Sequence, residues 1–287
     1  QVRANYNKLI EDVDFFISNY DFPDRENLSL VMEDTKKCFV QSNFIGLAGY
    51  SNALKDERMH DALWHTVVFT IISVALELVL GLGLAIIMNK AMKGQGIVRA
   101  VSLIPWAIPT TVAALMWSYL YDGSNGIVAN ILQNLHIISD SRNLLLSGGG
   151  AMASTILADV WKTTPYMALL ILAGFQTIPG TVYESAKVDG SGVFNTFFKI
   201  TLPLLKPSIL VALLMRTLDA FRVFDLIYVL TGGGPGGSTE TMSIYAYKTM
   251  FQQTNFGYGS VIVLLMVVCV AIIATFYIKI LGANAME

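Results

Sequence analysis

Four charged residues repeat at every third position inside an otherwise apolar stretch. They are Arg216, Asp219, Arg222 and Asp225. On a single α-helix this spacing places each basic group about one turn from an acidic one, so that the four form a ladder. Charges within an apolar helix are costly unless they face a hydrated cavity or a partner. The ladder therefore predicts a polar path that can hydrogen-bond a hydrophilic solute, with mutual neutralisation between helices as the alternative.

A neighbouring apolar stretch carries a second polar set. Asp159 and Lys162 are again three residues apart and flank Trp161, while Glu77 stands alone in an earlier stretch. Charged hydrogen-bonding groups among aromatic rings suit a sugar, whose CH faces stack on rings while its hydroxyls bond. Helix packing is the alternative for each ring. The predicted path residues are Asp159, Trp161, Lys162, Arg216, Asp219, Arg222, Asp225 and Tyr228.

The composition shows that membrane helices must position these residues. The 287-residue chain is 54% hydrophobic and only 14% charged, whereas a soluble domain carries about a quarter charged residues. Charged residues make up 18 of the first 63 positions but only 22 of the remaining 224. This pattern excludes a soluble enzyme and a disordered chain, and the net charge of −2 excludes a nucleic-acid binder.

Five stretches are apolar enough to cross about 30 Å of hydrocarbon as a helix, which needs roughly 20 residues. They are Trp64–Met88, Ile97–Tyr121, Ala151–Ile178, Pro207–Leu230 and Tyr258–Leu281. We therefore expect an all-α, polytopic helical bundle over residues 64–281. Pro105 and Pro109 are expected to bend the second helix.

The loops give the orientation, because cytoplasmic loops are enriched in Lys and Arg. Residues 89–99 and 179–206 each carry three such residues, whereas 122–150 and 231–257 each carry one. We expect the first two loops in the cytoplasm and residues 1–63 to form an extracytoplasmic N-terminal segment. Because that segment contains no signal peptide, we also expect a sixth membrane helix before it.

The loop over residues 179–206 is long and unusually apolar. Val188, Val193, Phe194 and Phe198 are among its large apolar residues. A cytoplasmic loop of this kind predicts docking against a partner. Residues 181–188 can form a short helix, which glycines at 190 and 192 would end.

The same loop resembles the EAA motif of the permease subunits of ABC importers. The matching residues are Glu184, Ser185, Ala186, Gly190, Ile200, Leu202 and Pro203. Ser185 replaces the first Ala of the motif, a small residue for a small one. Residues 160–179 and 224–235 also resemble sugar permeases of the maltose, trehalose and glycerol-phosphate type, with the trehalose type most similar. The resemblance covers about residues 44–281.

The resemblance implies a type I ABC importer permease of the bacterial inner (plasma) membrane. Such a subunit pairs with a second permease, receives sugar from an extracytoplasmic sugar-binding protein, and is driven by two ATPase subunits that bind ATP and Mg²⁺. An α-linked disaccharide such as trehalose or maltose is the expected solute, with glycerol 3-phosphate as the alternative. The loop would form a coupling helix seated in an ATPase, made or shaped by Glu184, Ser185, Ala186, Asp189, Gly190, Ile200, Leu202 and Pro203.

We expect the chain itself to bind no cofactor or metal and to be no enzyme. It contains no G-x-x-x-x-G-K-[ST] motif for ATP phosphates. Its three histidines and two cysteines are too scattered for a metal site. An ion-coupled secondary transporter of a polar solute is the alternative function, but the inverted repeat common in that class is not visible here.

Overall fold

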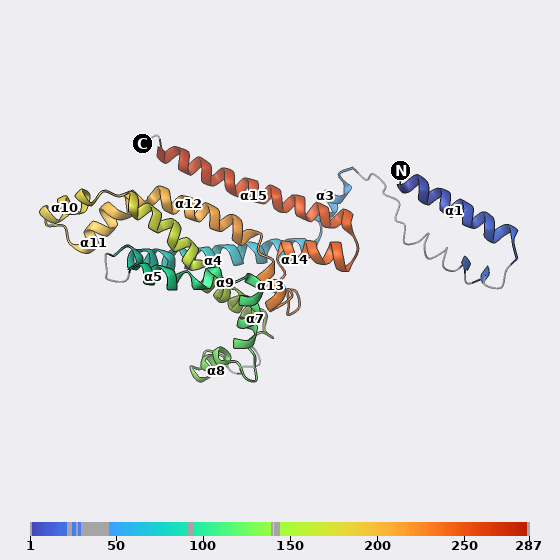
Figure 1. Cartoon of the computed structure of the whole chain (residues 1–287), viewed down its shortest axis with the longest axis horizontal. Coiled ribbons are helices and arrows are strands. Elements are labelled where there is room, and N and C mark those ends of the chain that lie inside the picture. The colour runs from blue at the N-terminus through green and yellow to red at the C-terminus, as the bar shows by residue number, and fades with distance from the viewer. Residues whose placement is uncertain are drawn as a thin grey trace. The chain divides into compact units, whose positions relative to one another are not determined.

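A computed structural model describes residues 2–21, 25–26, 28–29, 46–90, 95–138, 140 and 144–285, with side chains between residues 8 and 280. The chain divides into two compact units, Gln1–Leu47 and Ala48–Glu287. Every regular element in the described ranges is a helix (Figure 1). The predicted all-α fold class is thereby confirmed.

The first unit contains one long helix, α1 (Val2–Asn19). Leu9, Phe16 and Tyr20 are exposed along it. The rings of Phe16 and Tyr20 stack with their centroids 5.1 Å apart. This unit therefore presents an apolar stripe on an otherwise polar helix.

The second unit holds the remaining helices. They are α3 (Ala48–Ala53), α4 (Glu57–Asn89), α5 (Gln95–Ser102), α6 (Ile104–Ala107), α7 (Thr110–Leu120), α8 (Ile127–Asn134), α9 (Gly148–Thr177), α10 (Gly180–Val188), α11 (Val193–Thr196), the π-helical turn η2 (Phe197–Thr201), α12 (Leu202–Phe221), α13 (Asp225–Leu230), α14 (Met242–Tyr247), the π-helical turn η3 (Lys248–Gln252) and α15 (Phe256–Ala285). Helices α10 and α11 lie at one end of this unit, and α14 lies towards the other (Figure 1).

The central core forms where α4, α9 and α12 pack together. Phe69, Met167 and Leu205 are fully buried within it. Glycines allow the close approach: a Cβ at Gly81 would lie 2.8 Å from Met167 Cγ, and a Cβ at Gly174 would lie 2.4 Å from the Ser208 hydroxyl. Small residues at these crossings are typical of helices packed in a membrane.

Four helical segments in the described ranges are long and apolar enough to span a membrane. They are Glu57–Asn89, Gly148–Thr177, Val193–Phe221 and Phe256–Ile280. The first begins before the predicted Trp64, because the Asp56 side chain caps it by accepting a hydrogen bond from the Arg58 amide at 3.0 Å.

The predicted span Ile97–Tyr121 is wrong as a single helix. The chain here forms α5, α6 and α7, with Pro105 in the first turn of α6 and Pro109 at the N-cap of α7. Ile108, just before Pro109, is extended at φ −70° and ψ 133°. Proline lacks an amide donor and disfavours helical backbone in the preceding residue. The two prolines therefore break the helix instead of only bending it.

The predicted span Pro207–Leu230 is also wrong as a single helix. Helix α12 ends at Phe221, and α13 starts at Asp225. Between them the backbone leaves the helical region, with Phe224 at φ −135° and ψ −65°. The Val223 carbonyl accepts a hydrogen bond from the Thr241 hydroxyl at 3.4 Å. A contact with a distant segment thus replaces continuation of the helix.

Candidate functional site

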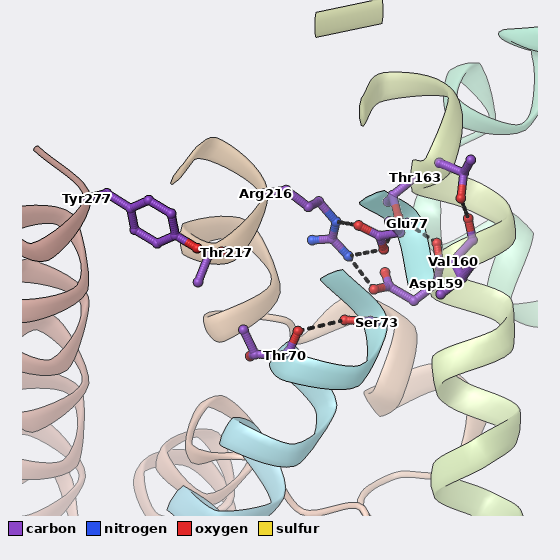
Figure 2. A network of polar contacts seen from close by, with 10 residues as sticks. Thr70, Ser73, Glu77, Asp159, Val160, Thr163, Arg216, Thr217 and Tyr277 are labelled. Carbon is purple, nitrogen blue, oxygen red and sulfur yellow. Dashed lines mark hydrogen bonds and ion pairs between the residues drawn. The ribbon is translucent and has the colours of Figure 1, made fainter. Parts of the chain in front are cut away.

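A buried ion cluster joins the three core helices. Arg216 of α12 lies between Glu77 of α4 and Asp159 of α9, and we call these three residues the Arg216 cluster (Figure 2). Arg216 Nε donates to Glu77 Oε2 at 2.5 Å, and Nη2 donates both to Glu77 Oε1 at 2.9 Å and to Asp159 Oδ2. The three residues are 3%, 0% and 5% exposed, respectively. One guanidinium therefore pairs with two carboxylates and ties three helices together.

A threonine completes the hydrogen bonding of the Arg216 cluster. Thr163, one turn after Asp159 on α9, donates its hydroxyl hydrogen to Glu77 Oε1 at 2.6 Å (Figure 2). Buried charges are tolerated where their hydrogen-bonding capacity is met in this way. Glu77 is the one charged residue of its predicted span, and its partners come from two other helices, as the alternative of neutralisation between helices predicts.

The predicted ladder of four charges is broken in the structure. Arg216 points to Glu77 and Asp159, whereas Arg222 pairs with Asp219, with Nη2 2.8 Å from Oδ1. The Arg222 and Asp219 side chains are 65% and 54% exposed. Asp225 belongs to the next helix, where it stands in the first turn of α13. Only the Asp219–Arg222 step of the ladder therefore exists as an ion pair.

The aromatic residues of α9 pack against the broken helices α6 and α7. Trp161 meets Trp117 edge to face at 5.6 Å between centroids. Tyr166 stacks on Trp106 at the same distance. Lys162 points to the same region, with Nζ 3.4 Å from the Trp106 carbonyl oxygen. These contacts support helix packing as the role of Trp161, which belongs to a hydrophobic cluster.

A polar cavity of about 520 Å³ lies beside the first turns of α4 and the loop after α13. Arg58 donates two hydrogen bonds, of 2.7 and 2.9 Å, to the Glu240 carboxylate. Lys248 Nζ lies 2.8 Å from Glu240 Oε1. We call these three residues the Glu240 cluster. Burial alone would raise the pKa of Glu240, but the hydrogen bonds from Arg58 and Lys248 outweigh burial and lower it.

A second carboxylate near this cavity joins the start of α4 to α14 and α15. Asp56 accepts hydrogen bonds of 2.5 Å from the hydroxyls of Tyr245 and Tyr258. Burial and the Asp56 carboxylate raise the pKa of Tyr245 to about 12. Neither cluster was predicted, because the bonds from Arg58 to Glu240 and from Tyr245 to Asp56 each join residues more than 180 positions apart.

The loop with the EAA-like motif forms the predicted short helix as α10, and a second short helix, α11, that was not predicted. Glu184, Ser185 and Ala186 lie on α10, with Ala186 buried and the other two exposed. Asp189 follows as the C-cap, and Gly190 has φ +72°. That backbone conformation favours glycine. The motif therefore ends α10 in a sharp turn.

The rest of the motif leads back into the bundle. Ile200 lies in η2, and Leu202 and Pro203 open α12. Between the two halves, Val188, Val193 and Phe194 are 88%, 85% and 82% exposed. The tip of the loop is therefore an exposed apolar surface.

Comparison with known proteins identifies the fold and the family. Residues 77–285 match the family described as binding-protein-dependent transport system inner membrane component. The chain belongs to this family. In structure it resembles a bacterial ABC transporter involved in the import of the acidic polysaccharide alginate, with a TM-score of 0.75 at 22% identity over 98% of this chain and 95% of that one. That likeness shows the fold of a type I importer permease.

Two relatives of this inner-membrane component are similar over most of their length. The trehalose/maltose transport system permease protein MalF of Thermococcus litoralis is 45% identical over 237 residues, which cover 83% of this chain and 79% of the relative. The sulfoquinovosyl glycerol transport system permease protein SmoG of Agrobacterium fabrum is 40% identical over 242 residues, covering 84% and 78%. The chain is thus a multi-pass inner-membrane protein of an ABC importer.

Within this inner-membrane component, the structure brings together only part of the predicted path. Asp159 and Arg216 meet in the buried cluster, while Asp219 and Arg222 meet at an exposed position. Tyr228, 37% exposed, stacks on Phe224 instead of approaching a charged residue. Glu77, absent from the predicted path, is the central carboxylate of the buried cluster. A single carboxylate within the apolar first span was the sequence feature that could have indicated its role in the cluster.

Proposed function

We propose that this chain is a permease subunit of an ATP-driven sugar importer. With a second permease it would form an alternating-access path, to which an extracytoplasmic binding protein delivers the sugar. Two ATPase subunits carrying ATP and Mg²⁺ would drive the cycle from the cytoplasmic side. Family membership supports this function over the ion-coupled secondary transporter.

The observation that carries this proposal is the exposed surface at the tip of the EAA-like loop. Val188, Val193 and Phe194 are almost fully exposed, although each is large and apolar. Glu184 offers a carboxylate on α10, the helix that also carries Val188. An apolar surface on a loop rimmed by polar residues is typical of a protein interface. We assign this surface to contact with an ATPase subunit.

The solute path is proposed to run along the Asp219–Arg222 pair. Both side chains are more than half exposed, so their charged groups are accessible to a solute. Asp159 and Arg216 are buried and already hydrogen-bonded to each other, so we assign them to holding the path walls in place. Lys162 and Trp161 would support the wall from α9.

The solute is proposed to be an α-linked disaccharide such as trehalose or maltose. The similarity to a trehalose/maltose permease supports it. The related sulfoquinovosyl glycerol permease makes that compound the most useful competitor to test. Glycerol 3-phosphate is the control for a solute recognised by Arg222 through a phosphate.

Reconstitution of the complete importer in proteoliposomes tests the function. Uptake of labelled trehalose or maltose should require the binding protein, the second permease, the ATPase and ATP. Phe194→Ala should reduce recovery of the ATPase with the permeases, while Phe276→Ala, an exposed residue on α15, should not. Uptake by the purified chain alone, without nucleotide, would overturn the proposal.

A further inference from the structure

A continuous row of aromatic rings runs from the start of α15 to the start of α13. Neighbouring centroids are 5.8 Å apart for Phe256 and Phe251, 5.2 Å for Phe251 and Tyr247, and 5.1 Å for Tyr247 and Tyr228. Phe224 lies 5.1 Å from both Tyr247 and Tyr228. All these centroid distances lie within the range of about 4.5–7 Å over which aromatic rings contact each other. We call these five residues the aromatic track.

The aromatic track is open on one side. Phe251, Phe256 and Tyr228 are 61%, 54% and 37% exposed. A core cluster of rings would be buried on all sides, so packing within this chain does not account for the row.

Charged residues accompany the rings. Arg222 and Asp225 flank Phe224 and are exposed. Exposed charges at this density place a surface in water and not in hydrocarbon. The outer face of α15 differs, since Val267, Ile272 and Phe276 are exposed there among apolar neighbours. We therefore assign the α15 face, and not the aromatic track, to contact with lipid.

The aromatic track also connects two regions that a solute must visit. Its outer end, Phe256, begins α15 and falls within residues 231–257, which the Lys and Arg distribution assigns to the extracytoplasmic side. Its inner end, Phe224, comes two residues after Arg222, which pairs with Asp219. The row of rings thus leads from the extracytoplasmic mouth to the proposed solute path.

We propose that the aromatic track is a sugar-binding surface along which pyranose rings move between the mouth and the Asp219–Arg222 pair. The apolar CH faces of a sugar stack on rings without directional hydrogen bonds, so each contact is weak and easily exchanged. Because a disaccharide is longer than the spacing between neighbouring rings, it contacts the next ring before it leaves the last. This inference rests on the proposed transport of sugar.

Cysteine labelling in the complete importer tests where the rings lie. Phe251→Cys is introduced after Cys38→Ser and Cys269→Ser, and a membrane-impermeant maleimide is added from the extracytoplasmic side. Labelling is expected, and the binding protein loaded with trehalose or maltose should slow it in an importer trapped in the outward-open state. Phe276→Cys is the control and should not be labelled. An unreactive Phe251→Cys, as expected for a ring covered by lipid or by the second permease, overturns the inference, and so does labelling that sugar does not slow.

Uptake measurements test whether the rings act in transport. Phe251→Ala and Tyr247→Ala should lower sugar uptake by about twofold to tenfold, the range that corresponds to one lost ring contact. Phe251→Tyr and Tyr247→Phe keep the ring and should transport normally. Normal uptake by both alanine variants would overturn the inference while leaving the proposed function intact. Failure of the unsubstituted importer to take up any sugar would instead overturn the proposed function.

Discussion

Arg216 and Glu77, 139 positions apart in the sequence, form a two-pronged ion pair at the centre of the bundle, with 2.5 Å between Nε and Oε2. Both residues are almost completely buried. Such a pair holds α4 against α12, because separating the two helices would leave the Glu77 carboxylate buried without its counter-charge. The exposed pair formed by Arg222 and Asp219 on the same stretch carries no such constraint.

Removing Arg216 should therefore destabilise the bundle far more than removing Arg222. Arg216→Ala removes the ion-pair partner of two buried carboxylates, which we expect to cost about 3–5 kcal/mol. Arg222→Ala breaks an exposed pair and should cost less than about 1 kcal/mol. Thermal unfolding in detergent measures both. Equal losses of stability in the two variants would contradict the assignment of Arg216 to the buried cluster.

Arg222→Ala should show the opposite balance between stability and transport. If the exposed pair contacts the solute, Arg222→Ala and Asp219→Ala should each lower uptake by the assembled importer while its yield and melting temperature stay near those of the unsubstituted protein. Sugar uptake and complex recovery are measured on the same preparation. Normal uptake by both variants would assign the pair to structure alone.

The crossing of α9 and α12 predicts a second difference in stability. A Cβ at Gly174 would lie 2.4 Å from the Ser208 hydroxyl oxygen and 2.5 Å from its Cβ, so Gly174→Ala forces the two helices apart. We expect a loss of about 1–3 kcal/mol, as for other overpacked cores. Gly83→Ala is the matched control, since a Cβ there meets nothing within 4 Å. If both variants unfold at the same temperature, the close approach at Gly174 does not contribute to stability.

The Glu240 cluster should make stability depend on pH. The pKa of Glu240 in the folded protein lies below its ordinary value of 4.5, so the folded protein binds this proton less tightly than the unfolded chain does. The contribution of ionised Glu240 to the free energy of unfolding is complete above pH 4.5 and is lost as the pH falls through the pKa of the folded state. Glu240→Gln should therefore lower the melting temperature at neutral pH, with the two curves converging in acid. If the melting temperatures of the two proteins ran parallel across the pH range, the ion pairs of Glu240 with Arg58 and Lys248 would contribute nothing to stability. Glu184→Gln, which removes an exposed carboxylate, is the control.

The sequence predicts the helices of this protein better than their ends and partners. Long apolar runs predicted α4, α9 and α15, and the glycine at 190 predicted the end of α10. These features depend on neighbouring residues alone. The break between α12 and α13 was not predicted, because it depends on the contact between Val223 and Thr241 from a distant segment.

The polar site shows the same limit. Spacing of three residues makes an ion pair on one helix possible, and it correctly predicted Asp219 with Arg222. The same spacing misplaced Arg216, because burial makes its pairing with Glu77 and Asp159 worth more than a surface contact with Asp219. Which charges are buried depends on how three helices pack, and the repeat along one helix does not contain that information.

The turn at Gly190 yields a prediction about coupling. Gly190 has φ +72°, a conformation that costs other residues roughly 1–2 kcal/mol and β-branched residues more. Gly190→Val should therefore depopulate the native turn by about tenfold. We expect uptake to fall relative to ATP hydrolysis, because the displaced tip around Val193 and Phe194 no longer transmits ATPase movement to α12. Gly192→Ala is the matched control, since Gly192 has an ordinary φ of −69° and should tolerate a side chain. Uptake and ATPase activity are measured together in the reconstituted importer, and an unchanged ratio of sugar moved to ATP hydrolysed in Gly190→Val would refute the coupling role of this turn.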